Sequence, residues 1–550
     1  MTSTDDARAP EDFPVAWEDP ADPEVTWARD DMHMPFALAP LAAEYVRGIG
    51  AGFNLCYVVF GNFPQRTYCR VWNGYAYFAH RANVPEPERE ALSKRWLDVM
   101  RARAEVTEAY WKDEVLPEIK AIDRRLRDIE VEQLVPDDLA AAWDEAWALT
   151  SRLWDLHFCA ILGPYTVLDD LADLYEAVVV GAAPGESLRL IQGTIHELFE
   201  TEVSLERLAA IATEHPAVRD LLVDATGGDE GSHRPLDSAE IAAVDGGPAF
   251  LEALDAFLER HGHMGQGYDD LTFPSWAEEP SIALTQLGRR LASPPEAAEA
   301  RRQRLAAEAD ALGHAVRDRL AGKADELARF ESLLSLSRAI GPLTEVHNYW
   351  IDRLAQARIR ALSMRVGARL VAAGCLDAAD DVLFLHRGEI RELIERPRDV
   401  RTLVAERRAE HARRRAVKPP AYLGAPRKES SPDRFDGTPI ASDDVNVLLG
   451  TGASPGIVRG PARIALSPSD FGRIRAGDII VCPSSNPSWV PVFTIAAGLV
   501  TNTGGILSHA AVVAREFGLP AVVGAGDATT RIADGRQVEI DGTTGSVHLL

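Results

Sequence analysis

The stretch AAGLVTNTGGILSHAAVVAREFGLPAVVG occupies residues 496–524 and carries the strongest structural prediction in the chain. Its apolar start predicts a strand, the Gly504-Gly505 pair predicts a tight loop, and the alanine-rich run that follows predicts a helix. Ser508 is a favoured helix N-cap, because a serine hydroxyl accepts a hydrogen bond from a free backbone N–H of the first turn. The segment therefore places His509 in the first turn of a helix.

A helix N-terminus behind paired glycines suits an anion, since free amides and the positive end of the helix dipole face it. The predicted phosphate-binding residues are Thr501, Thr503, Gly504, Gly505 and Ser508. A neutral imidazole is a nucleophile near neutral pH, and the phosphoramidate that it forms can pass the phosphoryl group on. His509 is therefore the predicted catalytic residue. The alternative is an ordinary first-turn residue without chemistry.

The same segment resembles the swivelling phosphohistidine domain of the phosphoenolpyruvate-utilising enzymes. The family pattern T-x-G-G-x-x-S-H-A-A-x-x-A-R-E-x-G-x-P-A-V-x-G is matched from Thr503 to Gly524. GASPGIVRGPARI (452–464) and SSNPSWVPVF (484–493) resemble other parts of that domain, with Ser485 and Asn486 as departures. The resemblance implies that an ATP-grasp domain phosphorylates the histidine. The domain then swings to a second site and delivers the phosphoryl group to an acceptor.

The predicted fold is multidomain, with a large, mainly α-helical acceptor-binding domain followed by an α/β swivelling phosphohistidine domain. Residues 1–25 are acidic and proline-rich and are expected to be disordered. Residues 26–415 are expected to form the acceptor-binding domain. It contains a β-hairpin at CRVWNGYAYFAH (69–80), and from Pro85 to about Arg415 apolar residues at steps of three and four predict long helices. Residues 416–447 are rich in proline and serine and read as a flexible linker, and 448–550 form the phosphohistidine domain.

Residues 1–415 show no glycine-rich phosphate lid and no mixed α/β body, and the sequence stops at Leu550. The resemblance therefore implies that an ATP-grasp partner subunit binds ATP and Mg²⁺ in trans, as in phenylphosphate synthase and the cresol-phosphorylating systems of this family. We expect no metal ligands in this chain.

The stretch FLERHGHMGQGYDDLTFPSWAEEP (257–280) resembles the acceptor-binding domain of rifamycin phosphotransferase. Met264 and Tyr268 stand where that family commonly has arginine and glutamate, which favours a smaller and more apolar acceptor. His263, in a glycine-rich loop, is the first candidate for the base that deprotonates the acceptor hydroxyl. The alternative is a histidine that only bonds loop backbone. Tyr268 and Asp270 are predicted substrate-binding residues.

Aromatic residues are concentrated near the N-terminus, where twelve of the fifty-two residues from Trp27 to Phe78 are Phe, Tyr or Trp. They predict either the wall of an apolar pocket or an ordinary core. On the pocket interpretation Trp27 and Phe36 bind the substrate, and His33 is the second candidate base.

TEVHNYWIDR (344–353) brings Glu345, His347 and Arg353 together on one helical segment. These residues could steady the incoming phosphohistidine, with Arg353 as a further substrate-binding residue. A solvated helix face is the alternative.

The formal net charge of -26, from 84 acidic and 58 basic residues, disfavours nucleic acid and anionic membranes as partners. Five scattered cysteines without a CxxC pair, and an N-terminus without a signal peptide, predict a cytoplasmic protein.

The predicted function is a dikinase-type phosphotransferase component that passes phosphoryl from ATP through His509 to a small hydroxyl compound. A phenol, giving an aryl phosphate in aromatic compound metabolism, is the first acceptor. An antibiotic or natural product is the alternative within enzymes, and a non-catalytic phosphocarrier is the alternative outside them.

Overall fold

The computed structural model describes residues 13–31, 33–61, 63, 65–183, 185–226, 234–265, 270–426, 442, 444–466, 468–485 and 489–550. The chain divides into two compact units. Unit 1 comprises Met1–Thr166, Gly267–Phe273 and Trp350–Ser430, and unit 2 comprises Val167–Gln266, Pro274–Tyr349 and Ser431–Leu550. This division differs from the expected domain boundaries, because the helical residues from 167 to 349 are grouped with the C-terminal sheet.

Unit 1 contains a four-stranded sheet in the order β2-β3-β1-β4. Its strands are β1 (Thr26–Arg29), β2 (Gln65–Trp72), β3 (Tyr75–Ala82) and β4 (Tyr422–Gly424). Asn73 and Gly74 both have positive φ, 51° and 83°, at the turn between β2 and β3. Two such residues form the turn that matches the twist of a hairpin, so the predicted hairpin is confirmed. β4 lies in the expected linker and pairs with β1. Residues 427–441 of that linker lie outside the described residues.

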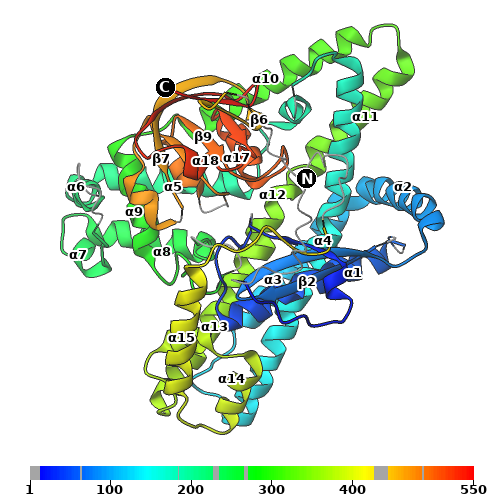
Figure 1. Cartoon of the computed structure of the whole chain (residues 1–550). Helices are drawn as coiled ribbons and strands as arrows, with labels where there is room; N and C mark the ends of the chain where they lie inside the picture. Colours follow the sequence, from blue (N-terminus) through cyan, green and yellow to red (C-terminus); the bar gives the residue numbers. More distant parts are fainter. Residues whose placement is uncertain are drawn as a thin grey trace. The chain divides into compact units, whose positions relative to one another are not determined.

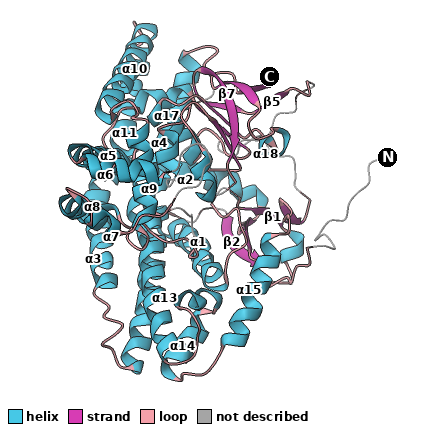
Figure 2. Ribbon diagram, turned by 90° about the vertical axis from the view of Figure 1, so that its left-hand side faces the viewer, coloured by secondary structure: helices cyan, strands magenta, loops and turns pink. Residues whose placement is uncertain are grey.

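The helices of unit 1 surround this sheet (Figures 1 and 2). They are α1 (Pro40–Val59), α2 (Glu86–Tyr110), α3 (Leu116–Arg127), the first part of α4 (Pro136–Val178), α13 (Leu354–Ala372), α14 (Arg387–Glu395) and α15 (Arg401–Arg415), with the short turns η1 (Asp22–Glu24), η2 (Trp111–Val115) and η5 (Ala379–Phe384). α1 and α4 touch backbone to backbone, because a Cβ on Gly52 would lie 2.6 Å from the Trp154 carbonyl oxygen.

Residues 13–25, expected to be disordered, have a defined fold. Phe13 is buried against Tyr75 and Tyr77, and the Asp22 side chain is fully buried beside the guanidinium of Arg81. Aromatic anchors such as Phe13 bury enough apolar area to order a segment that its acidic composition marks as mobile. Residues 1–12 lie outside the described residues.

The helical part of unit 2, here called the helical segment (167–266 and 274–349), begins with the second part of α4. It continues with η3 (Glu186–Ile191), α5 (Glu197–Glu214), α6 (Pro216–Ala225), α7 (Ser238–Ala242), α8 (Gly247–His261), α9 (Pro280–Ala292), α10 (Ala298–Arg319), α11 (Ala324–Ile340) and α12 (Leu343–His347). The π-helical turn η4 (Asn348–Arg353) connects it to unit 1 in the sequence.

The C-terminal domain of unit 2 is an eight-stranded sheet in the order β5-β12-β11-β7-β8-β9-β10-β6. Its elements are β5 (Val447–Leu449), β6 (Thr451–Ser454), β7 (Ile457–Ile464), η6 (Pro468–Arg473), β8 (Ile479–Cys482), α16 (Val490–Phe493), β9 (Gly498–Thr501), α17 (His509–Phe517), β10 (Ala521–Val523), α18 (Ala528–Arg531), β11 (Gln537–Asp541) and β12 (Ser546–Leu549). β7, β8, β9 and β10 run parallel, and the outer strands pair antiparallel.

Side chains alternate between the two faces of the central strands, as strand geometry requires. On β8, Ile480 packs with Ala511 and Ala514 of α17, whereas Ile479 packs on the other face with Ala528 of α18. The sheet is therefore covered on both faces, and the predicted fold class, a large helical part with a C-terminal α/β domain, is confirmed. Within the ranges described above, no helix is both long and apolar enough to cross a membrane.

Candidate active site

The loop between β9 and α17 forms the site that the sequence predicts. The Ser508 hydroxyl accepts a hydrogen bond from the Ala511 amide at 3.4 Å, and α17 begins at His509. Gly504 has a φ of 107°, and a Cβ there would lie 2.8 Å from the Ser508 Oγ. Only glycine fits this position without strain. The predicted loop, cap and first-turn histidine are thus confirmed as local structure.

His509 is buried, with 7% of its surface exposed. Its Nδ1 lies 2.7 Å from an Oε2 oxygen of Glu345, which is itself buried in α12. An ionised carboxylate can only accept, so Nδ1 carries the proton in this pair and Nε2 carries the nucleophilic lone pair. The contact fixes both the tautomer and the orientation of the ring.

The predicted phosphate-binding hydroxyls hold the loop together. The Thr501 hydroxyl donates to the Thr503 carbonyl at 2.7 Å, and the Thr503 hydroxyl donates to the Pro483 carbonyl at 3.1 Å. Their hydrogens are therefore already used within the protein. The donors that remain for an anion include backbone amides of the first turn of α17, but not that of Ala511, which donates to the Ser508 hydroxyl.

Arg515 braces the same loop from behind. Its guanidinium is buried and donates to the carbonyls of Ala453 at 3.0 Å and Ile506 at 2.7 Å. Burial lowers the pKa of Arg515 to about 10, although the charges of Glu516 and Glu345 oppose that shift. The side chain remains a cation at neutral pH. It ties β6 and the glycine loop to α17.

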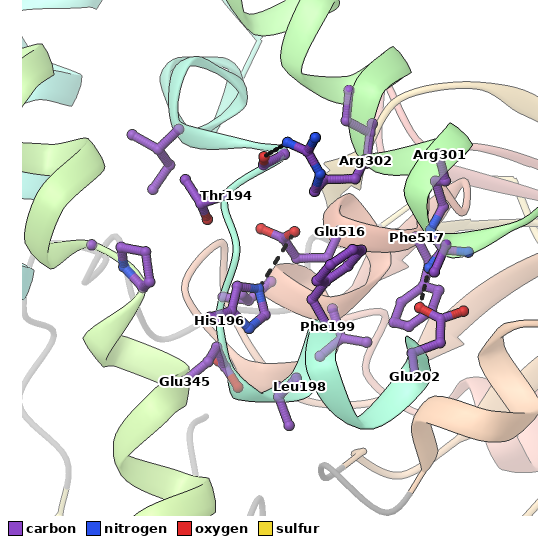
Figure 3. Close-up of a pocket in the computed structure, with 18 of the residues that line it drawn as sticks. Thr194, His196, Leu198, Phe199, Glu202, Arg301, Arg302, Glu345, Glu516 and Phe517 are labelled. Atoms are coloured by element: carbon purple, nitrogen blue, oxygen red, sulfur yellow. Dashed lines mark hydrogen bonds and ion pairs between the residues drawn. The ribbon is translucent and has the colours of Figure 1, made fainter. Parts of the chain in front are cut away.

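A second histidine–glutamate contact involves His196, which precedes α5, and Glu516 of α17. The His196 Nε2 lies 3.8 Å from a Glu516 oxygen, and Figure 3 shows the two side chains pointing toward one another. Burial alone lowers the pKa of His196. Interaction with Glu516 and the charges of Glu197 and Glu345 outweigh burial and raise that pKa above its ordinary value. His196 lies in GTIHELF, a stretch without a motif, so no sequence pattern marked it as a site residue.

His263 lies inside the packed helical segment. It is buried, and its ring meets the Tyr349 ring edge-on at 4.4 Å. The adjoining Met264 and Trp276 are buried as well. This packing buries the His263 side chain, which the sequence places in a glycine-rich loop. Tyr268 lies outside the described residues.

Asp270 belongs to unit 1 and holds its own loop. It is buried and accepts hydrogen bonds from the amide and the hydroxyl of Thr272, at 2.9 and 2.8 Å. Burial raises the pKa of Asp270 despite these bonds, and its backbone carbonyl accepts from the Gln356 side chain at 2.9 Å. The structure thus shows Asp270 shaping the loop.

Glu345, His347 and Arg353 are all buried, so their segment is not a solvated helix face. The His347 Nδ1 lies 2.7 Å from the Leu343 carbonyl, which is its helical neighbour. Glu345 meets His509, whereas Arg353 belongs to unit 1. His347 is therefore bonded within its own helix, whereas Glu345 contacts the predicted carrier histidine.

The N-terminal candidates belong to unit 1. Trp27 is fully buried, donates from Nε1 to the Asp22 carbonyl at 2.9 Å and meets Trp72 edge-on. The Arg415 guanidinium lies over the Phe36 ring at 5.0 Å. Trp27 is therefore part of the core, which is the plainer of the two interpretations of the aromatic segment.

The His33 side chain is 42% exposed, and its Nδ1 lies 2.9 Å from Asp30. Of the three predicted catalytic histidines, His509 and His263 belong to unit 2 and His33 belongs to unit 1.

Two family models match the chain. Residues 474–545 match the mobile domain of PEP-utilising enzymes, and residues 173–345 match the fourth domain of rifampicin phosphotransferase. These two matches confirm the resemblance to the phosphoenolpyruvate-utilising enzymes that was inferred from residues 496–524. Apart from Gly267–Phe273, both segments lie in unit 2, and they contain His509, Glu345, His196 and Glu516.

The relatives are longer proteins. Chondramide synthase of Chondromyces crocatus is 30% identical over all of this chain and 14% of its own length. The uncharacterized phosphotransferase YvkC of Bacillus subtilis is 26% identical over 74% of this chain and 48% of its own length. Rifampicin phosphotransferase of Streptomyces sviceus is 32% identical over 64% of this chain and 39% of its own length. The chain thus spans about half or less of each of these relatives.

Proposed function

We propose that this chain is the phosphoryl-carrying component of a phosphotransferase, with His509 as the carrier. The observation that supports this most directly is the 2.7 Å contact between the His509 Nδ1 and Glu345, both buried, at the N-terminus of α17. Relatives named phosphotransferases support the reaction class. The five cysteines, all free, support a reducing, cytoplasmic setting.

In the first half-reaction the His509 Nε2 attacks the β-phosphorus of ATP. A bond from Nε2 to that phosphorus forms, its bond to the oxygen shared with the α-phosphorus breaks, and AMP leaves. Water then removes the γ-phosphate as inorganic phosphate, so the β-phosphoryl group stays on His509. The ring gains positive charge as it is phosphorylated, and the Glu345 carboxylate, already bonded to Nδ1, stabilises that charge. The amides of the first turn face the phosphoryl oxygens. ATP and Mg²⁺ are held by an ATP-grasp partner, as the family resemblance of the sequence implies.

In the second half-reaction an acceptor hydroxyl attacks the phosphohistidine. We take the acceptor to be a hydroxyl on an antibiotic or other natural product. The rifampicin phosphotransferases and the chondramide synthase among the relatives support this class. A phenol is the second acceptor class. It is supported by the pocket beside His196, whose walls include the rings of Phe199 and Phe517.

The first half-reaction is tested with ATP labelled on the β-phosphate. We expect the purified chain alone to stay unlabelled, and addition of an ATP-grasp partner to give an acid-labile label on the chain. The label should vanish in His509→Ala and persist in His314→Asn, a change at an exposed histidine of α10. Label on the lone chain would show that no ATP-grasp partner is needed, and label on His509→Ala would show that His509 is not the carrier.

A further inference from the structure

An open pocket lies within unit 2, between the helical segment and α17. Its empty volume, counted out to open solvent, is about 710 Å³. Most of its wall is apolar, and the side chains that contribute are Ile191, Leu198, Phe199, Leu305, Val513 and Phe517. A compact, largely apolar molecule suits such a wall.

The pocket ends at the carboxylate that holds the carrier histidine. Glu345 lines the pocket and is the residue bonded to the His509 Nδ1. A ligand in the pocket therefore lies next to the His509–Glu345 pair.

His196 is one of the polar side chains in this mainly apolar wall. Its side chain is 7% exposed, and it lines the pocket. Its Nε2 lies 3.8 Å from Glu516, but among the residues that the structure describes no group hydrogen-bonds to its Nδ1. A buried polar atom without a partner is costly and needs an explanation, and a catalytic role is one.

The pair His196–Glu516 has the arrangement that makes a histidine a base. At 3.8 Å the Glu516 carboxylate acts on His196 through its charge rather than through a hydrogen bond: it favours the tautomer with the proton on Nε2 and stabilises the imidazolium formed when Nδ1 takes a proton. Here the nitrogen left with the lone pair is the buried Nδ1. Interaction with Glu516 also raises the pKa of His196 against the opposing effect of burial.

The charges around His196 favour its protonated form. Glu197 and Glu345 add to Glu516 on this side. The nearby cations are otherwise engaged, because Arg301 pairs with Glu202, and Arg302 pairs with Glu299 and donates to the Gly193 carbonyl. The positive charges of Arg301 and Arg302 are therefore offset by their own partners and oppose proton uptake by Nδ1 less than unpaired arginines would.

We propose that His196 is the general base for the acceptor hydroxyl, that Glu516 is its positioning residue, and that the pocket binds a small apolar hydroxyl compound. This deepens the proposed function and rests on it, and of the two acceptor classes named there it selects the phenol. In the transfer step the acceptor oxygen bonds to phosphorus and the bond from phosphorus to the His509 Nε2 breaks. The hydroxyl proton passes to the His196 Nδ1, and His509 regains its neutral ring. Because His196 lies on the helical segment and Glu516 on α17, the base is complete only with the C-terminal domain in this position.

The assignment of the two nitrogens is tested without turnover. In ¹⁵N-histidine NMR spectra of the whole chain, with His196→Asn to assign the signal, the neutral ring should carry its proton on Nε2. Added phenol should shift the Nδ1 resonance of His196, and Glu516→Gln should lower the pKa read from the titration. A proton on Nδ1 in the neutral form, or no response of His196 to phenol or to any natural-product alcohol tried, would overturn the proposal.

The kinetic test starts from chain already phosphorylated on His509. Transfer to phenol in a single turnover should fall roughly 10²- to 10⁴-fold in His196→Gln, the usual contribution of a general base, while labelling of His509 stays intact. Glu516→Gln should show a smaller loss that Glu516→Asp partly restores. Glu214→Gln, at an exposed position of α5, is the control.

The pH profile separates a base from a structural residue. The wild-type transfer rate should rise through the pKa of His196, and this inflection should be missing in His196→Gln. Transfer by His196→Gln at the wild-type rate would overturn the base. Absence of label on His509 would instead refute the proposed function, and the NMR titration would still decide the role of His196.

Discussion

Two histidine–glutamate pairs connect the C-terminal domain to the helical segment, and they run in opposite directions. His509 belongs to α17 and meets Glu345 of α12 at 2.7 Å. His196 belongs to the helical segment and faces Glu516 of α17 at 3.8 Å. Both histidine side chains are buried, so neither pair is a surface ion pair that solvent screens.

The two pairs differ in what the second ring nitrogen can reach. The His509 ring sits at a capped helix N-terminus, where free amides favour an anion. The His196 ring sits on the wall of an apolar pocket, where a hydroxyl fits better than an anion. The same two residue types therefore support a nucleophile in one place and a base in the other. The environment of the second ring nitrogen, rather than the pair itself, decides the chemistry.

The largest expected effect on the rate of His509 phosphorylation, among changes that keep the carrier histidine, comes from Glu345→Gln. The amide oxygen can still accept from the His509 Nδ1, but the negative charge that stabilises the phosphorylated ring is lost. We expect phosphorylation of His509 by the ATP-grasp partner to slow by roughly 10- to 100-fold, the usual cost of changing a residue that orients a reacting group. Rapid-quench labelling measures this rate.

The matched control is Glu326→Gln, which changes an exposed glutamate of α11 paired with Lys323. Glu345→Asp should recover part of the rate, since it keeps the charge. Equal rates for Glu345→Gln and the wild type would show that the Glu345 contact is only structural. The charge of Glu345 would then not stabilise the phosphorylated ring of His509.

The sequence predicted the His509 loop well because its geometry is local. Gly504 has a positive φ, which favours glycine. Ser508 caps the helix that follows, and His509, the next residue, is therefore the first residue of that helix. Glu345 was among the predicted partners because TEVHNYWIDR concentrates chemical side chains in one turn. Its contact with His509 is long-range, however, and only the packing of α12 against the C-terminal domain shows it.

The parts that sequence did not predict depend on burial. Trp27 reads equally well as a pocket wall or as core, and only the fold shows that it is fully buried. His263 lies in a glycine-rich stretch of the sequence, yet its side chain is buried and its ring contacts the ring of Tyr349. His196 and Glu516 are far apart in the sequence, and neither occupies a position whose spacing signals the other.

A smaller effect is expected on the pH dependence of stability, and it comes from His196. Its pKa in the folded protein is raised above the ordinary value of about 6.5. The pair with Glu516 therefore contributes its full stability below that value and loses it as pH rises through the folded pKa. We expect the melting temperature of the wild type to fall more than that of Glu516→Gln between about pH 6 and the alkaline side of the folded pKa.

The comparison between the two proteins is needed because other histidines titrate in the opposite sense. Burial lowers the pKa of His261 to about 4, so that residue costs stability as pH falls. The difference between wild type and Glu516→Gln cancels this background. A difference that stays constant with pH would show that His196 keeps one protonation state throughout the range.

The smallest expected effect concerns the N-terminal caps of the helices at the two histidines, α17 and α5. Ser508 caps α17 through its hydroxyl, whereas His196, at the equivalent position of α5, makes no side-chain cap bond. Ser508→Ala should therefore cost about 1 kcal/mol of local stability, and Ser508→Thr should cost less. Amide hydrogen exchange reads this directly, because about 1 kcal/mol raises the opening equilibrium roughly fivefold. The Ala511 amide should exchange faster by that factor in Ser508→Ala, while the first-turn amides of α5 stay unchanged. Unchanged exchange at Ala511 would mean that packing on the sheet, and not the cap, positions His509.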